Sequence, residues 1–161
     1  MSVFITNTSK RFTDVSLSFE ANPVTGDLTT LSNERAINNS LKNLMMISTT
    51  EVPYNSQIGS GIPSYLFEVF DDVTADLISK EIERIIKFSE PRIELTPPVD
   101  LFNITTEGNR SIDPDEALYK ALNSVIVEAR PSQNQFLVTI TYKIVGYEQV
   151  MTFTHLLEPT R

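Results

Sequence analysis

The fold is decided by the stretch between residues 73 and 95, which reads VTADLISKEIERIIKFSEPRIEL. Its apolar residues recur at three- and four-residue spacing, and this period predicts a helix with one buried face. Those residues are Ala75, Ile78, Ile82, Ile85 and Ile86. Because Thr74 can accept a hydrogen bond from a free amide of the first turn, we expect it to cap the helix.

A proline corner follows this helix. Pro91 lacks an amide hydrogen and disfavours helical geometry at Glu90, so the helix is expected to end by about Ser89. Glu90 and Arg92 then flank a fixed corner that leads into an extended apolar segment. On spacing alone, the simplest interpretation of this charged pair is a local couple at a helix end.

The N-terminal part of the chain is expected to contain an arm, a short strand and a second helix. Residues 1–11 predict an arm that becomes ordered against a partner. Alternation predicts a strand whose apolar face is formed by Val15, Leu17 and Phe19. Ser32 is expected to cap the second amphipathic helix. Its apolar face consists of Ile37, Leu41, Leu44 and Met45.

Prolines and glycines between Glu51 and Pro63 predict a packed loop. Tyr54 and Ile58 are its expected anchors. The run Gly59–Gly61 lacks both the lysine of a phosphate loop and the third glycine of a dinucleotide loop, which favours a tight turn. Ser64 is expected to start a short helix. That helix would carry Leu66, Phe67 and Phe70 into the core.

Strand-like segments dominate the C-terminal half. They are Ile93–Leu95, Val99–Ile104, Ser124–Glu128, Phe136–Ile144 and Val150–Leu157. The last two alternate around a turn at Gly146, which predicts an antiparallel hairpin. A capping signal at Asp113 predicts a helix, so residues 105–123 are expected to form a helical insert. The expected fold is a single α+β domain over residues 1–161, with N-terminal helices packed on a mainly antiparallel C-terminal sheet.

Composition argues against several classes of function. The formal net charge of −8 gives no general attraction to phosphate backbones or anionic lipid, so neither nucleic acid nor a membrane is an expected partner. Cysteine is absent, which excludes thiolate metal sites and disulfides. No apolar run is long enough to span a bilayer, and no signal peptide is recognisable, so we expect a protein that works where it is made.

The sequence offers little for catalysis, and no cofactor or metal site is expected. His155 is the single histidine and lies within a predicted strand, where a structural role is expected. Two acids across a cleft could cleave a glycosidic bond. The nameable pairs are Glu90 with Glu94 and Asp71 with Asp72. With twenty-one acidic residues such pairs arise by chance, so the protein is not expected to be an enzyme.

A set of short motifs in fixed order resembles a known family. The motifs are Asn43-Leu44, Pro53-Tyr54-Asn55, Ile58-Gly59-Ser60-Gly61, Leu66-Phe67-Glu68, Leu77–Ile86 and Glu90-Pro91-Arg92-Ile93. This order is similar to that of the baseplate wedge proteins of contractile phage tails, a family that includes the sheath initiators of type VI secretion systems. The resemblance is close from Ser32 to Leu95 and looser beyond. The arm and the insert have no counterpart in it.

The resemblance implies a structural subunit with two binding surfaces. The corner formed by Glu90, Pro91 and Arg92 would dock on the core bundle of the baseplate wedge, and an arginine fork held by a proline corner suits such docking. The C-terminal strands would pair with strands of the tail sheath protein. The expected positions for that pairing are Val150, Thr152 and Thr154.

The same resemblance implies further partners and a location. Tail tube or hub proteins are expected neighbours, with six copies in each baseplate. The protein would be part of the virion, assembled in the host cytoplasm. Whether the source is a phage tail or a secretion machine stays open. The alternative function is a peptidoglycan-cleaving glycosidase, since the family carries an old lysozyme label.

Overall fold

The structure is a computed structural model that describes residues 11–16, 19–98, 119 and 122–159. The predicted strand Val99–Ile104 and the predicted helix start at Asp113 lie outside the described residues. The same holds for almost all of the predicted arm, residues 1–11, and for most of the predicted insert, residues 105–123.

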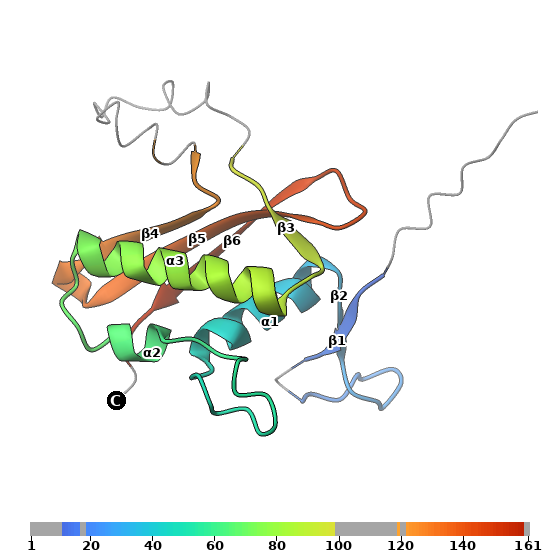
Figure 1. Cartoon of the computed structure of the whole chain (residues 1–161). Helices are drawn as coiled ribbons and strands as arrows, with labels where there is room; N and C mark the ends of the chain where they lie inside the picture. Colours follow the sequence, from blue (N-terminus) through green and yellow to red (C-terminus); the bar gives the residue numbers. More distant parts are fainter. Residues whose placement is uncertain (1–10, 17–18, 99–118, 120–121, 160–161) are drawn as a thin grey trace, which may run out of the picture.

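The described chain has an α+β fold, as the sequence predicts (Figure 1). In chain order the elements are β1 (Thr13–Val15), β2 (Thr30–Ser32), α1 (Glu34–Met46), α2 (Ile62–Tyr65), α3 (Asp72–Ser89), β3 (Ile93–Leu95), β4 (Val125–Arg130), the 3-10 helix η1 (Pro131–Gln133), β5 (Gln135–Ile144) and β6 (Val150–Leu157). The hairpin β5–β6 confirms the predicted C-terminal hairpin, with Gly146 at a φ of 91° in its turn.

The main sheet is antiparallel and is built on β5. β6 pairs with β5 along one side. β4 and β3 share the other side end to end, and Thr141 of β5 marks the junction: its amide donates to the Ser124 carbonyl (2.7 Å), and its carbonyl accepts from the Thr96 amide (3.1 Å). β1 and β2 form a separate two-stranded ribbon. β6 is therefore the outer strand on one side of the sheet, and β4 and β3 are the outer strands on the other.

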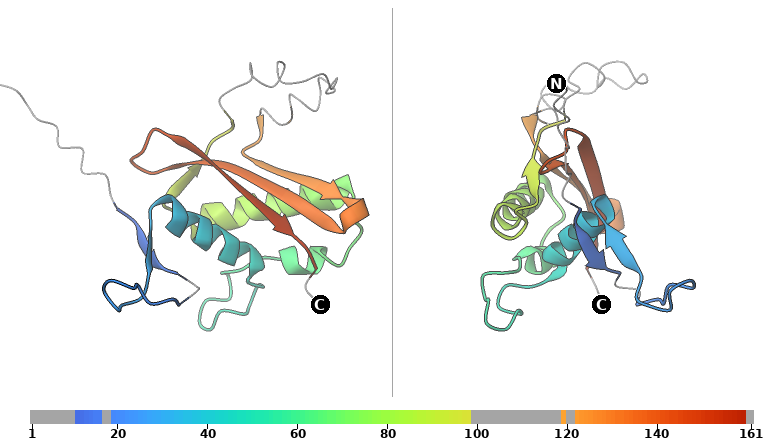
Figure 2. Two further views of the ribbon diagram at one scale, coloured as in Figure 1. Left: turned by 180° about the vertical axis from the view of Figure 1, so that it is seen from behind. Right: turned by 90° about the vertical axis from the view of Figure 1, so that its right-hand side faces the viewer.

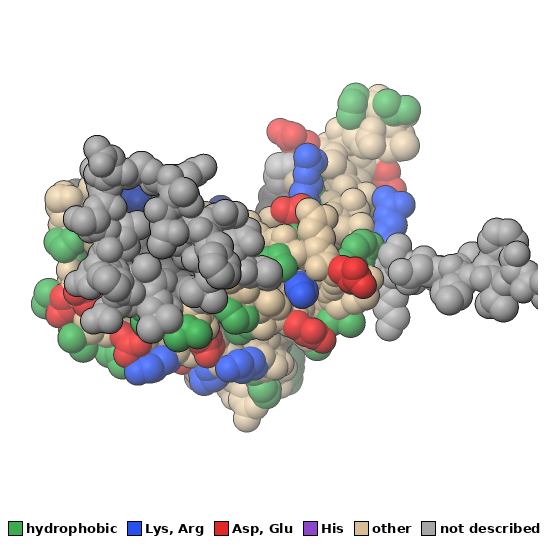
Figure 3. Space-filling model, turned by 90° about the horizontal axis from the view of Figure 1, so that it is seen from above, with side chains coloured by type: hydrophobic (Ala, Val, Ile, Leu, Met, Phe, Trp, Pro, Cys, Tyr) green, Lys and Arg blue, Asp and Glu red, His purple; other side chains and the backbone are tan. Residues whose placement is uncertain are grey.

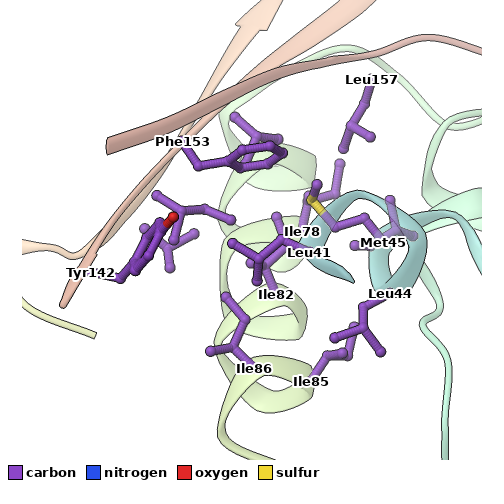
Figure 4. Packing of buried hydrophobic residues seen from close by; sticks show 14 of the residues in the cluster. Leu41, Leu44, Met45, Ile78, Ile82, Ile85, Ile86, Tyr142, Phe153 and Leu157 are labelled. Atoms are coloured by element: carbon purple, nitrogen blue, oxygen red, sulfur yellow. The ribbon is translucent and has the colours of Figure 1, made fainter. Parts of the chain in front are cut away.

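One face of the sheet forms the core with the helices. The buried apolar residues of β5 are alternate ones, as a strand with one covered face requires. They are Phe136, Val138, Ile140, Tyr142 and Ile144. α3 runs along the sheet and α1 packs beside it (Figure 2). Figure 4 shows side chains of α1, α3, β5 and β6 converging on one cluster.

The organising helix has the buried face predicted for it, but a different cap. All five predicted apolar residues are buried, and α3 ends at Ser89 as expected. The cap is Asp71, whose carboxylate accepts from the Thr74 amide at 2.8 Å, and the prediction of Thr74 is wrong. Thr74 is buried inside the first turn. A carboxylate at this place also interacts favourably with the helix dipole.

The start of α1 also differs from the prediction. Ser32 ends β2, and the residue before α1 is Asn33, with a φ of 49°. Its side-chain oxygen does not cap the helix because it accepts from the Phe12 amide at 3.2 Å. Asn33 thereby fastens the start of β1 to α1, and the predicted apolar face of α1 is buried as expected.

Four side chains predicted to lie on an apolar face or to pack are exposed, because the exposure of a side chain depends on long-range packing. They are Val15, Phe19, Tyr54 and Phe67, and Phe19 lies outside β1. Ile58 does pack on the core, as do Leu66 and Phe70. The short helix begins at Ile62, two residues before the predicted Ser64.

Gly59 confirms the tight turn predicted for Gly59–Gly61. Its φ is +119°, and a Cβ placed there would lie 2.5 Å from the Ser48 carbonyl oxygen. Only glycine fits such a position, since an added side chain would be both strained and in contact with backbone.

Candidate interaction site

In the Glu90–Arg92 corner the two charged side chains pair with each other. Arg92 Nε donates to Glu90 Oε1 (2.5 Å), and Arg92 Nη2 donates to Glu90 Oε2 (2.6 Å). Ser40 of α1 donates its hydroxyl to the same Oε2 at 2.6 Å. Glu90 is only 2% exposed, and the Arg92 side chain is 26% exposed. The corner is therefore a two-point ion pair with its acidic side in the core.

The backbone and an aromatic ring hold this pair in place. The Glu90 amide donates to the Ile86 carbonyl at the end of α3, and the Val145 amide donates to the Arg92 carbonyl at 2.9 Å. The Arg92 guanidinium lies over the ring of Phe12, 5.9 Å from its centroid. The corner thus joins α3, the end of β5 and the start of β1.

Electrostatics favour the charged form of both partners. Burial alone raises the pKa of Glu90, but the hydrogen bonds from Arg92 and Ser40 and the charge of Arg92 outweigh it, so the pKa is lowered. The hydrogen bond to Glu90 raises the pKa of Arg92 against the opposing effect of burial. Glu90 is thus held as a carboxylate in the folded protein.

The structure favours the local interpretation of this pair. Two guanidinium nitrogens of Arg92 donate to Glu90. The Arg92 side chain is therefore not wholly available to an outside partner. The surface part of the corner consists of Pro91, which is exposed, and the outer edge of Arg92. A hollow of about 340 Å³ beside it is lined by Ile86, Lys87, Glu90, Pro91, Ile93, Glu94 and Leu95.

Acid is expected to weaken the fold through Glu90. Because its folded pKa lies below the unfolded value, Glu90 contributes stability above a pH of about 4.3, and this is lost as the pH falls through the folded pKa. The unfolding temperature of the wild type should therefore fall more steeply between about pH 5 and pH 3 than that of Glu90→Gln. Thermal melts over this range measure it, with exposed Glu94→Gln as the control. Parallel curves for wild type and Glu90→Gln would contradict the assignment.

The second predicted surface, on β6, is an open strand edge. Because Thr141 bonds toward β4 and β3, the odd-numbered residues of β5 point their backbone groups away from β6. Thr141 faces Thr152 and Lys143 faces Val150 in the register. The backbone groups of Val150, Thr152 and Thr154 therefore point away from β5, to the side on which β6 has no strand neighbour among the described residues.

The corner and the β6 edge are separate surfaces. The corner leads into β3, which lies on the opposite side of β5 from β6. The side chains of Thr152 and Thr154 are exposed on the sheet face opposite the core, whereas Val150 is half-buried. The two predicted surfaces therefore lie on opposite sides of β5.

Several residues of the corner were missed by sequence reasoning. Ser40 lies 50 positions before Glu90 and Phe12 lies 80 before Arg92, so no local pattern joins them. Near the corner, the Tyr142 hydroxyl donates to Asn38 Oδ1 at 2.7 Å. Burial, with smaller effects of Glu34 and Glu90, raises the pKa of Tyr142 to about 12.

One acid of each pair considered for glycoside cleavage is engaged in another interaction. A general acid needs a raised pKa. The pKa of Glu90 is lowered, and the Thr74 amide lowers that of Asp71. His155 is half-buried in β6 with its ring 6.0 Å from that of Phe153, and burial lowers its pKa.

Other kinds of site were sought in the described part of the chain. Its acidic and histidine side chains form no cluster that could hold a metal ion. None of its helices has the length and hydropathy needed to cross a membrane. Seen from above (Figure 3), the coloured acidic and basic side chains are interspersed.

Comparison with known proteins establishes the fold. No family model matches the chain, and no curated protein matches it in sequence. A solved crystal structure from Geobacter sulfurreducens, described as a "putative tail lysozyme", has a similar fold. The TM-score is 0.58 at 20% identity, over 83% of this chain and 97% of the other. A likeness at this identity is a likeness of fold, and function has to be argued from the site.

Proposed function

We propose that this protein is a structural subunit of a contractile tail: a baseplate wedge protein that starts the sheath. The observation that carries the proposal is the open edge of β6. Val150, Thr152 and Thr154 offer outward backbone groups there, which is what addition of a sheath strand requires. The fold shared with a protein described as a "putative tail lysozyme" supports the same assignment.

The corner supplies the second contact of the proposal. Pro91 is exposed beside a hollow, and Arg92 is held in one orientation by Glu90. A fixed guanidinium loses little freedom on binding, so its exposed edge suits docking on the wedge core bundle. In this role the internal pair positions Arg92 for the partner. The remaining proposed neighbours are tube or hub proteins, with six copies in each virion baseplate.

Electron microscopy of tail assemblies formed without this protein tests the proposal. We expect baseplates that carry no sheath, and normal sheaths once the protein is added back. Full-length sheaths in its absence would refute the role in sheath initiation.

The name of the structural neighbour makes a peptidoglycan-cleaving glycosidase the second candidate. A zymogram on purified peptidoglycan distinguishes the two. We expect no clearing by the purified protein, because one acid of each nameable pair, Glu90 and Asp71, has a lowered pKa. Clearing that a single Glu→Gln or Asp→Asn substitution abolishes would replace the structural proposal with the enzymatic one.

A further inference from the structure

The loop between α1 and α2, residues 48–60, is fixed at its base. Ser48 and Ser60 form a β-bridge between its two ends. The buried Ser60 hydroxyl donates to the Met45 carbonyl of α1 at 2.9 Å. Gly59 lies so close to the Ser48 carbonyl that no side chain fits between them. The two ends of the loop are therefore held against each other and against the end of α1.

An ion pair of α3 holds the second end of the loop. Arg84 donates through Nε and Nη2 to the Glu81 carboxylate, at 2.9 and 2.7 Å, and through Nη2 to the Gly59 carbonyl at 3.3 Å. Glu81 Oε1 accepts from the Gly61 amide at 3.0 Å. Both charges are thus engaged in positioning the loop, and neither is counted here as an attraction for a partner.

The tip of the loop carries an aromatic ring on a strained backbone. Tyr54 has a relative exposure of 110%, and its φ is 67°, which is uncommon for a residue of this kind. Turns on both sides impose this conformation, because the Asn55 amide donates to the Val52 carbonyl and the Ile58 amide donates to the Asn55 carbonyl. Strain of this kind is concentrated at functional sites.

The loop projects from the body of the molecule. In Figure 1 and in both views of Figure 2 it extends past α1 and α2 on the side away from the sheet. A hollow of about 310 Å³ lies beside it and is lined by Thr49, Ser56, Gln57, Arg84 and Phe88. Phe88 is exposed, and Arg84, the charged residue of this lining, is paired with Glu81. The surface therefore combines a projecting ring with an uncharged recess.

The charge of the loop decides what kind of partner fits. Glu51 is the only charged residue among residues 48–60, and its carboxylate accepts from the Ser48 amide at 2.9 Å. A loop without lysine or arginine does not attract a phosphate backbone or anionic lipid. A rigid tyrosine is instead typical of protein interfaces, because its ring buries a large area with little loss of conformational freedom. The surface complementary to it is an apolar pocket in another protein.

We propose that Tyr54 inserts its ring into an apolar pocket of another protein of the same tail assembly, and that this protein also covers the hollow beside Phe88. The identity of the assembly rests on the proposed function, whereas the surface includes neither Arg92 nor the edge of β6. A fully exposed ring gives the free protein nothing in return for the strain at Tyr54. Its contribution comes from the contact made on binding.

Baseplates assembled without this protein test the inference by co-sedimentation with added protein. Tyr54→Gly should bind roughly tenfold more weakly or worse, and Tyr54→Phe, which keeps the ring, within about threefold of the wild type. Isolated Tyr54→Gly should unfold at the same temperature as the wild type or above it, because glycine adopts a positive φ without strain. Tyr54→Asn also tolerates this φ and should lose binding to the same extent.

Phe19→Gly is the matched control. It removes another exposed aromatic residue with a positive φ, 51°, from the connection between β1 and β2, and should bind like the wild type. A loss below tenfold in folded Tyr54→Gly and Tyr54→Asn would overturn this inference alone, as would an equal loss in Tyr54→Phe or in Phe19→Gly. Wild-type protein that fails to sediment with these baseplates would refute the proposed function and this inference together.

Discussion

Arg92→Ala is expected to lower the free energy of unfolding by about 3 kcal/mol, the lower end of the range for breaking a buried ion pair, because the Arg92 side chain is one-quarter exposed. The variant leaves the Glu90 carboxylate buried with the Ser40 hydroxyl and without its cation. For a chain of this size the unfolding temperature should fall by roughly 6 to 12 °C. Thermal and urea unfolding of the isolated protein measure the effect.

Two further variants separate the ion pair from general effects of losing a long side chain. Lys87→Ala removes an exposed partner of Glu83 on α3 and should cost less than about 0.5 kcal/mol. The double variant Glu90→Leu/Arg92→Met replaces both charges with apolar groups and should recover most of the loss. An unchanged melting temperature for Arg92→Ala would show that the internal pair is dispensable and that the guanidinium serves a partner.

Under the proposed role in sheath initiation, Thr154→Pro is expected to abolish sheath assembly while leaving the domain folded. The Thr154 amide points to the free side of β6, so proline there removes no bond to β5 and deletes a donor that an added strand needs. Thr154→Ala keeps the amide and should support normal sheaths. The measurement is electron microscopy of sheath subunits added to preformed baseplates, with circular dichroism to verify the fold of both variants.

A proline at the next residue of β6 tests the register on which this expectation depends. His155 faces Val138 of β5, so His155→Pro removes an inward amide and should destabilise the domain by about 1 to 3 kcal/mol, the cost of leaving a buried acceptor unpaired. Both Thr154 variants should still sediment with baseplates through the corner. Full-length sheaths on folded Thr154→Pro would exclude this edge as the template. Another edge, such as the predicted strand Val99–Ile104, would then take its place.

Much of the fold could be predicted because it depends on local periodicity. The buried faces of α1 and α3 follow the 3.6-residue period, and that of β5 follows the two-residue period. The end of α3 at Ser89 follows from the covalent structure of Pro91. Caps were harder to predict, since Asp71 and Thr74 both suit a helix start and their geometry decides between them.

The sequence by itself determined which residues form the apolar faces of α1, α3 and β5, where the organising helix α3 ends, and that the final two strands form a hairpin. Tertiary structure alone decided that Glu90 meets Ser40 across 50 positions and that Tyr142 meets Asn38 across 104. It also decided which amides of β4 and β6 point outward, since that depends on the register with β5. Periodicity is a property of the local chain, whereas partners and free edges exist only once distant segments have packed.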